Sequence, residues 1–110
     1  MKQFELGYVV GLLEGEGCFS LRQSGPANKY RRKYASVEVQ SADRDVLERL
    51  LEYLGVGTIG GPYKTREKHH APMYSWRVST DVAIAVMKLV LPHMSARRRD
   101  RIEEVIRDSC

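Results

Sequence analysis

The sequence predicts an α+β domain in which helices cover one face of an antiparallel sheet. Three observations lead to this prediction. Two pairs of segments alternate apolar and polar residues on either side of a turn or loop, which is typical of β-hairpins with one buried face. A segment with helical apolar spacing precedes each hairpin, and two further helical segments follow the second. Hairpins separated by helices in the order α-β-β-α-β-β-α(α) favour a sheet with its helices on one side.

The size and composition exclude several classes of protein. The chain has 110 residues, which we interpret as a single domain spanning residues 1–110. Hydrophobic residues make up 43% and charged residues 29%, as in an ordinary soluble globular protein. The apolar runs are too short to span a membrane, and the first residues lack a secretory layout. The two cysteines, Cys18 and Cys110, form neither a disulfide framework nor a metal-binding pattern, so we expect an intracellular, reduced protein.

The first predicted element is a helix over residues 4–15 that is apolar on nearly every side, so it must be buried on more than one side. Gly7, Gly11 and Gly15 recur every four residues and therefore stack on one helix face. Each glycine costs about 1 kcal/mol relative to alanine, so a close backbone contact must offset the cost. Either this helix packs tightly on its own sheet or, as we favour, it packs against a helix of a second subunit.

The first hairpin is predicted from residues 18–23 and 30–40, with turn residues between them. Phe19 and Leu21 point to the core from the first strand. On the second strand, apolar residues occupy every inward position and more polar residues occupy every outward position. The inward residues are Ala35, Val37 and Val39, and the outward residues are Tyr34, Ser36, Glu38 and Gln40.

The second half repeats this pattern. Asp43 or a neighbour caps a helix that Gly55 ends, and residues 56–63 and 73–80 form the second hairpin. In the last strand of this hairpin, we expect Tyr74 and Trp76 to belong to the core; the alternative is that they stack on nucleic-acid bases. Asp81 is expected to cap a third helix, which stops at Pro92, and residues 95–107 form a short, highly charged final helix.

The net charge is +4, and the basic residues are clustered. Between residues 17 and 40 there are five basic residues and one acidic residue, Glu38. These basic residues are Arg22, Lys29, Arg31, Arg32 and Lys33. The loop of the second hairpin adds Lys64, Arg66, Lys68, His69 and His70. Clusters of one sign indicate a polyanionic partner such as nucleic acid, although solvated loops remain an alternative.

The segment Gly11-Leu12-Leu13-Glu14-Gly15-Glu16-Gly17 places two carboxylates where the apolar helix gives way to a strand. An unpaired buried carboxylate is costly, so these acids need a partner. A hard cation such as Mg²⁺ or Ca²⁺, which prefers oxygen ligands, is one candidate. The alternative is that one acid bonds to backbone amides while the other is solvated.

The nonapeptide from Val9 to Gly17, together with Cys18 and Phe19, resembles the signature of the LAGLIDADG homing endonucleases. The order of helices and hairpins extends this resemblance through nearly the whole chain. Because the motif occurs once, the resemblance is to the single-motif members, which act as homodimers. It implies a saddle-shaped four-stranded sheet that dimerises through the first helix.

The resemblance also implies roles for individual residues. Glu16 matches the metal-binding acid, and the carbonyl of Gly15 joins it. Glu38, with Gln40 as the runner-up, matches the polar residue that lines the active site, and Arg97 stands where the family has a lysine. The catalytic set is therefore Glu16, Glu38 and Arg97. Glu14 caps the partner helix, and the expected dimer interface comprises Gly7, Val10, Gly11 and Glu14.

The implied reaction is site-specific cleavage of double-stranded DNA at a long, near-palindromic target. Mg²⁺ is the implied cofactor, Ca²⁺ binds without supporting cleavage, and Mn²⁺ substitutes. The residues expected to contact DNA are Ser20, Arg22, Ser24, Lys29, Arg31, Arg32, Lys33, Tyr34, Ser36, Lys64, Arg66, Lys68, Ser75 and Arg77. Two alternatives remain: a DNA-binding regulator that does not cleave, and an RNA-binding maturase that assists intron splicing. The expected location is a bacterial or phage-infected cytoplasm, or an organelle.

Overall fold

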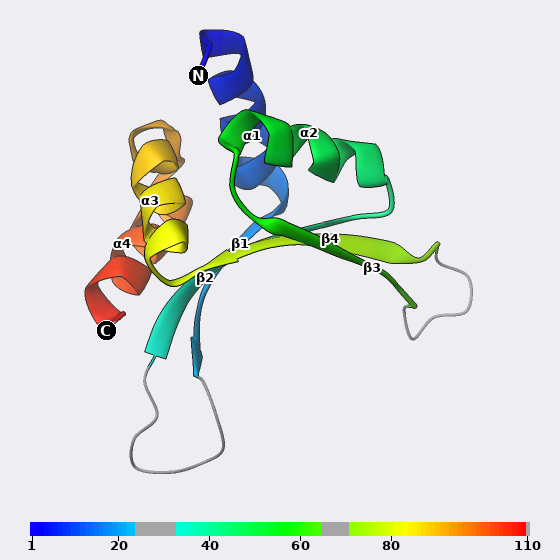
Figure 1. Cartoon of the computed structure of the whole chain (residues 1–110). Coiled ribbons are helices and arrows are strands. Elements are labelled where there is room, and N and C mark those ends of the chain that lie inside the picture. The colour runs from blue at the N-terminus through cyan, green and yellow to red at the C-terminus, as the bar shows by residue number, and fades with distance from the viewer. Residues whose placement is uncertain (24–32, 65–70, 110) are drawn as a thin grey trace.

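The computed structural model describes residues 1–23, 33–64 and 71–109 (Figure 1). The order of elements along these residues confirms the predicted order. The elements are α1 (Gln3–Glu16), β1 (Gly17–Gln23), β2 (Lys33–Ser41), α2 (Arg44–Leu54), β3 (Thr58–Tyr63), β4 (Met73–Ser79), α3 (Thr80–Val90), the 3₁₀ turn η1 (Leu91–His93) and α4 (Ala96–Asp108). Among the residues described, no helix is long and apolar enough to cross a membrane.

The helix ends agree with the sequence prediction except at α3. Asp43 is the N-cap of α2, and Gly55 ends that helix in the left-handed conformation, at φ +71°. The expectation that Asp81 caps α3 is wrong, because Ser79 occupies the N-cap and Asp81 lies within the first turn. An acid there still interacts favourably with the positive end of the helix dipole. Pro92 falls in η1, directly after α3, as expected of a residue that ends a helix.

The strands form one antiparallel sheet in the order β1-β2-β4-β3, so β1 and β3 are its edges. The pairing places Glu38 on β2 directly opposite Cys18 on β1 and Arg77 on β4. Figure 1 shows α1, α2, α3 and α4 on one side of the twisted sheet. Within the described part of the chain, the opposite face of the sheet carries no helix.

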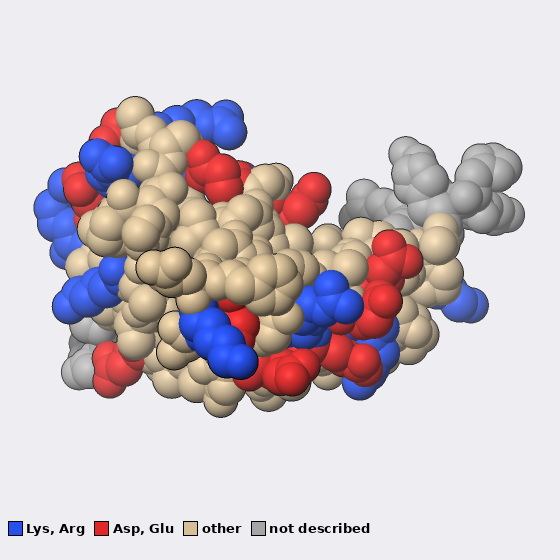
Figure 2. All heavy atoms as spheres, turned by 90° about the horizontal axis from the view of Figure 1, so that it is seen from above, with Lys and Arg blue, Asp and Glu red and all other residues tan. Residues whose placement is uncertain are grey.

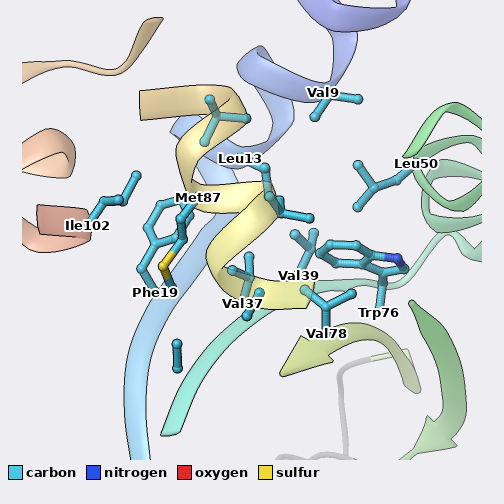
Figure 3. Packing of buried hydrophobic residues seen from close by; sticks show 14 of the residues in the cluster. Val9, Leu13, Phe19, Val37, Val39, Leu50, Trp76, Val78, Met87 and Ile102 are labelled. Carbon is cyan, nitrogen blue, oxygen red and sulfur yellow. The ribbon is translucent and has the colours of Figure 1, made fainter. Parts of the chain in front are cut away.

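The core lies between the sheet and these helices (Figure 3). The sheet and the helices each contribute fully buried side chains, and removing this apolar surface from water is the main stabilising contribution. The labelled core residues are Phe19, Val37, Val39, Trp76 and Val78 from the sheet, and Val9, Leu13, Leu50, Met87 and Ile102 from the helices. The prediction that Trp76 is a core residue is confirmed, and its indole N–H donates to the Val56 carbonyl at 3.1 Å.

The glycines of α1 do not face the core. The buried residues of this helix are Val9 and Leu13, whereas Gly7, Gly11 and Gly15 are exposed. A Cβ atom added at any of these three glycines would meet no described atom within 4 Å. The helix therefore does not use its glycines to pack on its own sheet.

Gly57 and Gly55 offer a matched test of how closely the buried Trp76 packs against the turn between α2 and β3. Gly57 has φ +110°, and a Cβ there would lie 2.2 Å from Nε1 of Trp76, whereas Gly55 has φ +71° and open space. We expect Gly57→Ala to lower the free energy of unfolding by roughly 3 kcal/mol or more, because it adds backbone strain and disturbs the buried indole. Gly55→Ala should cost only about 1 kcal/mol. Equal losses in urea unfolding would contradict the packing described.

Candidate active site and nucleic-acid interface

The face of the sheet away from the helices is polar, because alternate residues of each strand point to opposite faces. Buried Phe19, Val37 and Trp76 define the covered face, so their neighbours along each strand belong to the open one. The open-face residues are Cys18, Ser20 and Arg22 on β1, Tyr34, Ser36, Glu38 and Gln40 on β2, Ser75, Arg77 and Ser79 on β4, and Thr58 and Gly60 on β3.

The opposite, helix-covered side differs in its charge pattern. Figure 2 views the molecule from that side and shows basic and acidic side chains interspersed, without a large area of one sign. A polyanion is attracted to a surface that carries an excess of positive charge. The helix-covered side shown in Figure 2 lacks such a surface.

A cleft of about 420 Å³ opens on the sheet's uncovered face where α1 ends. Its lining residues are Glu16, Cys18, Glu38, Gln40 and Met73. Glu16 is the last residue of α1 and is exposed, and Glu38 and Gln40 come from the neighbouring central strand β2. The structure thus brings together the acid of the motif and both polar residues that the sequence singled out on β2.

This cleft continues along the sheet. A second depression, of about 410 Å³, shares Gln40 and Met73 with the first. Its other lining residues are Tyr63, Lys64, Ser75 and Arg77. The two depressions therefore lie side by side, and together they are called the groove; its lining residues extend from Glu16 across β2 and β4 to the end of β3.

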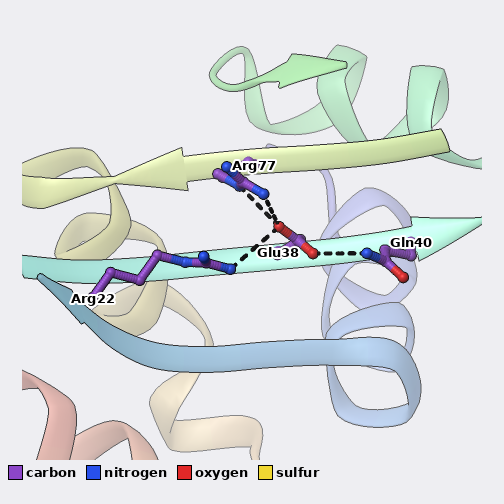
Figure 4. A network of polar contacts seen from close by, with 4 residues as sticks. All are labelled: Arg22, Glu38, Gln40 and Arg77. Atoms are coloured by element: carbon purple, nitrogen blue, oxygen red, sulfur yellow. Dashed lines mark hydrogen bonds and ion pairs between the residues drawn. The ribbon is translucent and has the colours of Figure 1, made fainter. Parts of the chain in front are cut away.

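Glu38 is the centre of a polar network in this groove (Figure 4). Its Oε2 atom accepts a hydrogen bond from Nε of Arg77 at 2.8 Å, is also bonded to Nη2 of Arg77, and lies 3.5 Å from Nη2 of Arg22. Its Oε1 atom accepts a hydrogen bond from the Gln40 amide at 3.0 Å. The Glu38 side chain is only 12% exposed, against 51% for Arg77 and 41% for Arg22. One carboxylate thus orients two cationic side chains and one amide.

The groove supplies hard oxygen donors of the kind that Mg²⁺ prefers, but the described residues do not form a complete metal site by themselves. Among residues 1–23, 33–64 and 71–109, no group of three or more His, Cys, Asp or Glu side chains converges. Glu16 offers one exposed carboxylate, and Gly15, next to it at the end of α1, is also exposed. Mg²⁺ commonly binds one or two carboxylates together with waters and substrate phosphates, so this donor set fits that ion when water or a phosphate supplies the remaining oxygens.

Glu14 and Arg97 occupy different surroundings. Glu14 is half-buried, and its Oε1 accepts a hydrogen bond from the backbone N–H of Ser95 at 3.2 Å, just before α4. Arg97 lies exposed in the first turn of α4. The neighbouring Arg98 instead bonds to the carbonyl of Gly17, the residue after Glu16. The sequence did not predict this bond, because the spacing of residues along the chain does not show where α4 docks on β1.

The expected DNA contacts fall into four groups, of which the buried Ser36 and Ser75 are the last. Ser20, Arg22 and Tyr34 are half-buried on the open face, while Arg77 on that face and Lys64 just after β3 are exposed. Lys33 is exposed at the start of β2, but it alternates with Tyr34 and so shares the face of Ala35. Six of the predicted contacts lie outside the described residues, and they are Ser24, Lys29, Arg31, Arg32, Arg66 and Lys68.

Ser36 and Ser75 lie on the open face, as expected, but the structure buries both of these predicted base contacts. Their residues are 0% and 7% exposed, and no described group bonds to either hydroxyl. Both residues have short side chains and lie on the two central strands. Their hydroxyls extend less far from the sheet than the side chains of long neighbours such as Glu38 and Arg77. Strand alternation predicts the face of a residue, but it does not predict how far the side chain reaches from that face.

Three groove residues were missed by the sequence prediction. Cys18 is exposed, Tyr63 is 57% exposed and Met73 is half-buried. The alternation of Phe19 and Leu21 already implied that Cys18 shares a face with Ser20. Nothing in the local pattern distinguished Tyr63 or Met73, whose meeting depends on the pairing of β3 with β4.

Comparison with known proteins supports the fold and identifies the family. The structure is similar to the homing endonuclease I-CvuI in complex with the I-CreI target, with a TM-score of 0.73 at 16% identity, over 96% of this chain and 65% of that one. It is also similar to the archaeal intron-encoded homing endonuclease I-Vdi141I complexed with DNA, with a TM-score of 0.70 at 23% identity, over 94% and 67% of the two chains.

The group I intron-encoded homing endonuclease I-CeuI complexed with DNA gives a TM-score of 0.70 at 15% identity, over 96% of this chain and 54% of that one. The chain thus spans about two thirds or less of the length of these proteins. No curated protein sequence matches it significantly. At the level of sequence, the model of the LAGLIDADG endonuclease family matches residues 9–96. The chain therefore belongs to the LAGLIDADG endonuclease family.

Proposed function

We propose that this protein is a site-specific DNA endonuclease that cuts a long, near-palindromic duplex as a homodimer, with the help of a divalent metal ion. The observation that carries the proposal is the position of Glu16. The last acid of the family motif lies at the end of a groove on the uncovered, polar face of the sheet. Membership of the family and the DNA complexes of similar proteins support the same reaction class.

The homodimer forms through α1. Its exposed glycine stripe has room for a second helix backbone, and Gly7, Val10, Gly11 and Glu14 make up the interface. Glu16 directly follows Gly15, the last glycine of this stripe, so a two-fold axis along α1 brings both copies of Glu16 close to the centre of the assembly. The two grooves then extend outward from that centre, and a two-fold protein reads a two-fold DNA site.

DNA lies along the groove on the open sheet face. A two-stranded β-ribbon fits the major groove, where each base pair presents a distinct pattern of donors and acceptors. Arg22 and Arg77 carry their guanidinium groups on this face and are the strongest candidates to read bases. The exposed Lys64 at the far end of the groove contacts phosphates, which position the duplex without specifying its sequence.

The chemistry is centred on the cleft at Glu16. The carboxylate of Glu16 and the carbonyl of Gly15 would hold the metal ion. A divalent ion bound there would supply Lewis-acid chemistry, which would polarise the scissile phosphate and lower the pKa of an attacking water molecule. We expect Mn²⁺ to substitute and Ca²⁺ to bind without supporting cleavage.

Glu38, Gln40 and Arg97 complete the proposed site. Oε1 of Glu38 accepts one hydrogen bond from Gln40 and retains a second acceptor position, so it can also order a water molecule in the shared cleft. Arg97 remains protonated near neutral pH and stabilises negative charge on the phosphate. Because an arginine is a poor proton donor, a DNA-binding protein that has lost cleavage is the second candidate function.

The first test replaces Glu16. Glu16→Gln preserves size and hydrogen bonding but removes the charge that holds the cation, so cleavage should fall by orders of magnitude while DNA affinity survives. The measurement pairs cleavage rate with equilibrium binding on one duplex selected from a random library, in Mg²⁺ and in EDTA. Glu103→Gln, an exposed acid of α4, is the control. Wild-type protein that binds tightly but never cuts would contradict the endonuclease, and a Glu16→Gln variant that cuts normally would contradict the assignment of Glu16.

The second test addresses the dimer. Gly11→Leu places a side chain where the monomer has open space, so the variant should fold but fail to pair. Lys88→Leu exposes a leucine on α3 instead and controls for nonspecific effects of an added apolar group. Sedimentation equilibrium should give a monomer for Gly11→Leu and a dimer for Lys88→Leu and wild type. A Gly11→Leu variant that stays dimeric places the interface elsewhere.

The third test separates Glu38 from Glu16. Glu38→Gln still bonds to Gln40 but loses the charge that orders water and restrains Arg22 and Arg77. We expect cleavage to fall by about 10²-fold or more, with an unchanged Mg²⁺ requirement, because Glu38 is not a metal ligand in this scheme. Binding to random-sequence DNA should rise, since two arginines are released. Unchanged cleavage would remove Glu38 from the catalytic set and leave Gln40 as the candidate.

A further inference from the structure

The last helix, α4, docks on the strand that follows Glu16. β1 is an edge strand, so on its outer side the carbonyls of alternate residues have no neighbouring strand to bond with. Nη1 of Arg98 donates to the carbonyl of Gly17 at 2.5 Å, and Nε of Arg101 donates to the carbonyl of Phe19 at 3.0 Å. Two arginines three residues apart on one helix face thus bind two carbonyls two residues apart on the strand edge.

Other contacts fix the same junction. The guanidinium of Arg98 lies 5.8 Å from the ring centre of Phe19, within the range of a cation–π contact, and the start of α4 bonds to Glu14 through the Ser95 N–H. Gly17 itself has no room for a side chain, because a Cβ there would lie 2.5 Å from the Leu13 carbonyl. The backbone on both sides of Glu16 is therefore held, while the Glu16 side chain remains exposed.

We propose that Arg98 is a positioning residue for the Glu16 carboxylate, which it fixes by holding the Gly17 carbonyl, with Arg101 supporting it at Phe19. The inference rests on the proposed metal role of Glu16. It concerns a part of the chain that the family match barely reaches, since that match ends at residue 96, where α4 begins. It also separates Arg98 from the adjacent Arg97, which carries the catalytic proposal.

The test uses Arg98→Met, which retains an apolar stem against Phe19 but removes the guanidinium. Hydrogen exchange at the amides of residues 15–19, followed by NMR, should speed up at least tenfold relative to wild type, with little change in the strands β3 and β4. The Mg²⁺ concentration for half-maximal cleavage should rise about tenfold, while DNA affinity in EDTA stays within twofold. Arg98→Lys, which restores a cationic donor, should recover most of both properties.

Arg107→Met is the matched control, because Arg107 lies on the same helix, is 70% exposed and pairs only with Asp108 among the described residues. It should behave as wild type. The proposal is overturned if Arg98→Met leaves either the local exchange or the Mg²⁺ requirement unchanged, or if exchange rises equally throughout the domain. If Arg98→Met does not fold, Arg101→Met makes the same comparison through the bond to Phe19. If the wild type cuts no DNA, the proposed function fails, whereas the exchange measurement still decides whether Arg98 holds the junction.

Discussion

Burial of one face of the sheet under the helices is the constraint on which the rest of the structure depends. Strand alternation sends Phe19, Val37, Val39, Trp76 and Val78 toward the helices and sends their neighbours to the other side. Within the described part of the chain, no helix covers that second face. It is therefore free to carry arginines, a glutamate and an amide side by side, and its length and polarity suit an extended, charged partner.

The same packing explains the place of the motif acids. Val9 and Leu13 anchor α1 in the core, so the end of the helix is fixed next to the sheet. Gly17 then starts β1 in contact with the Leu13 carbonyl, a position too close for any side chain. The helix ends at this point, and its final residue, Glu16, therefore lies at the edge of the groove. The exposed glycines of α1 occupy a different side of the helix, so one element can support the core, an acid at the groove and a contact with a second subunit.

The elements of the fold could be predicted because each has a strong local signal. Apolar periodicity located the helices and strands, and Gly55 marked the end of α2 through its left-handed conformation. The face of each open-side residue followed from alternation, whereas the place of Glu38 and Gln40 in the site was implied by the resemblance to the family. The burial of Ser36 and Ser75 could not be predicted, since it depends on the way in which the longer side chains next to them lie on the sheet. The bonds of Arg98 and Arg101 also could not, because they depend on where α4 docks, and five arginines in thirteen residues of α4 look alike in sequence.

The most direct test of the account asks whether DNA occupies the open sheet face, and Cys18 provides a natural probe. Its thiol is free and exposed in the cleft with Glu16 and Glu38. In a Cys110→Ser background, the rate of Cys18 alkylation is measured with and without saturating duplex DNA in Ca²⁺, beside a variant that carries Lys88→Cys and Cys18→Ser and so reports from the helix-covered side. The account predicts that DNA slows alkylation of Cys18 at least tenfold and leaves the α3 cysteine unaffected. Alkylation of Cys18 at the free rate while DNA is bound would contradict it.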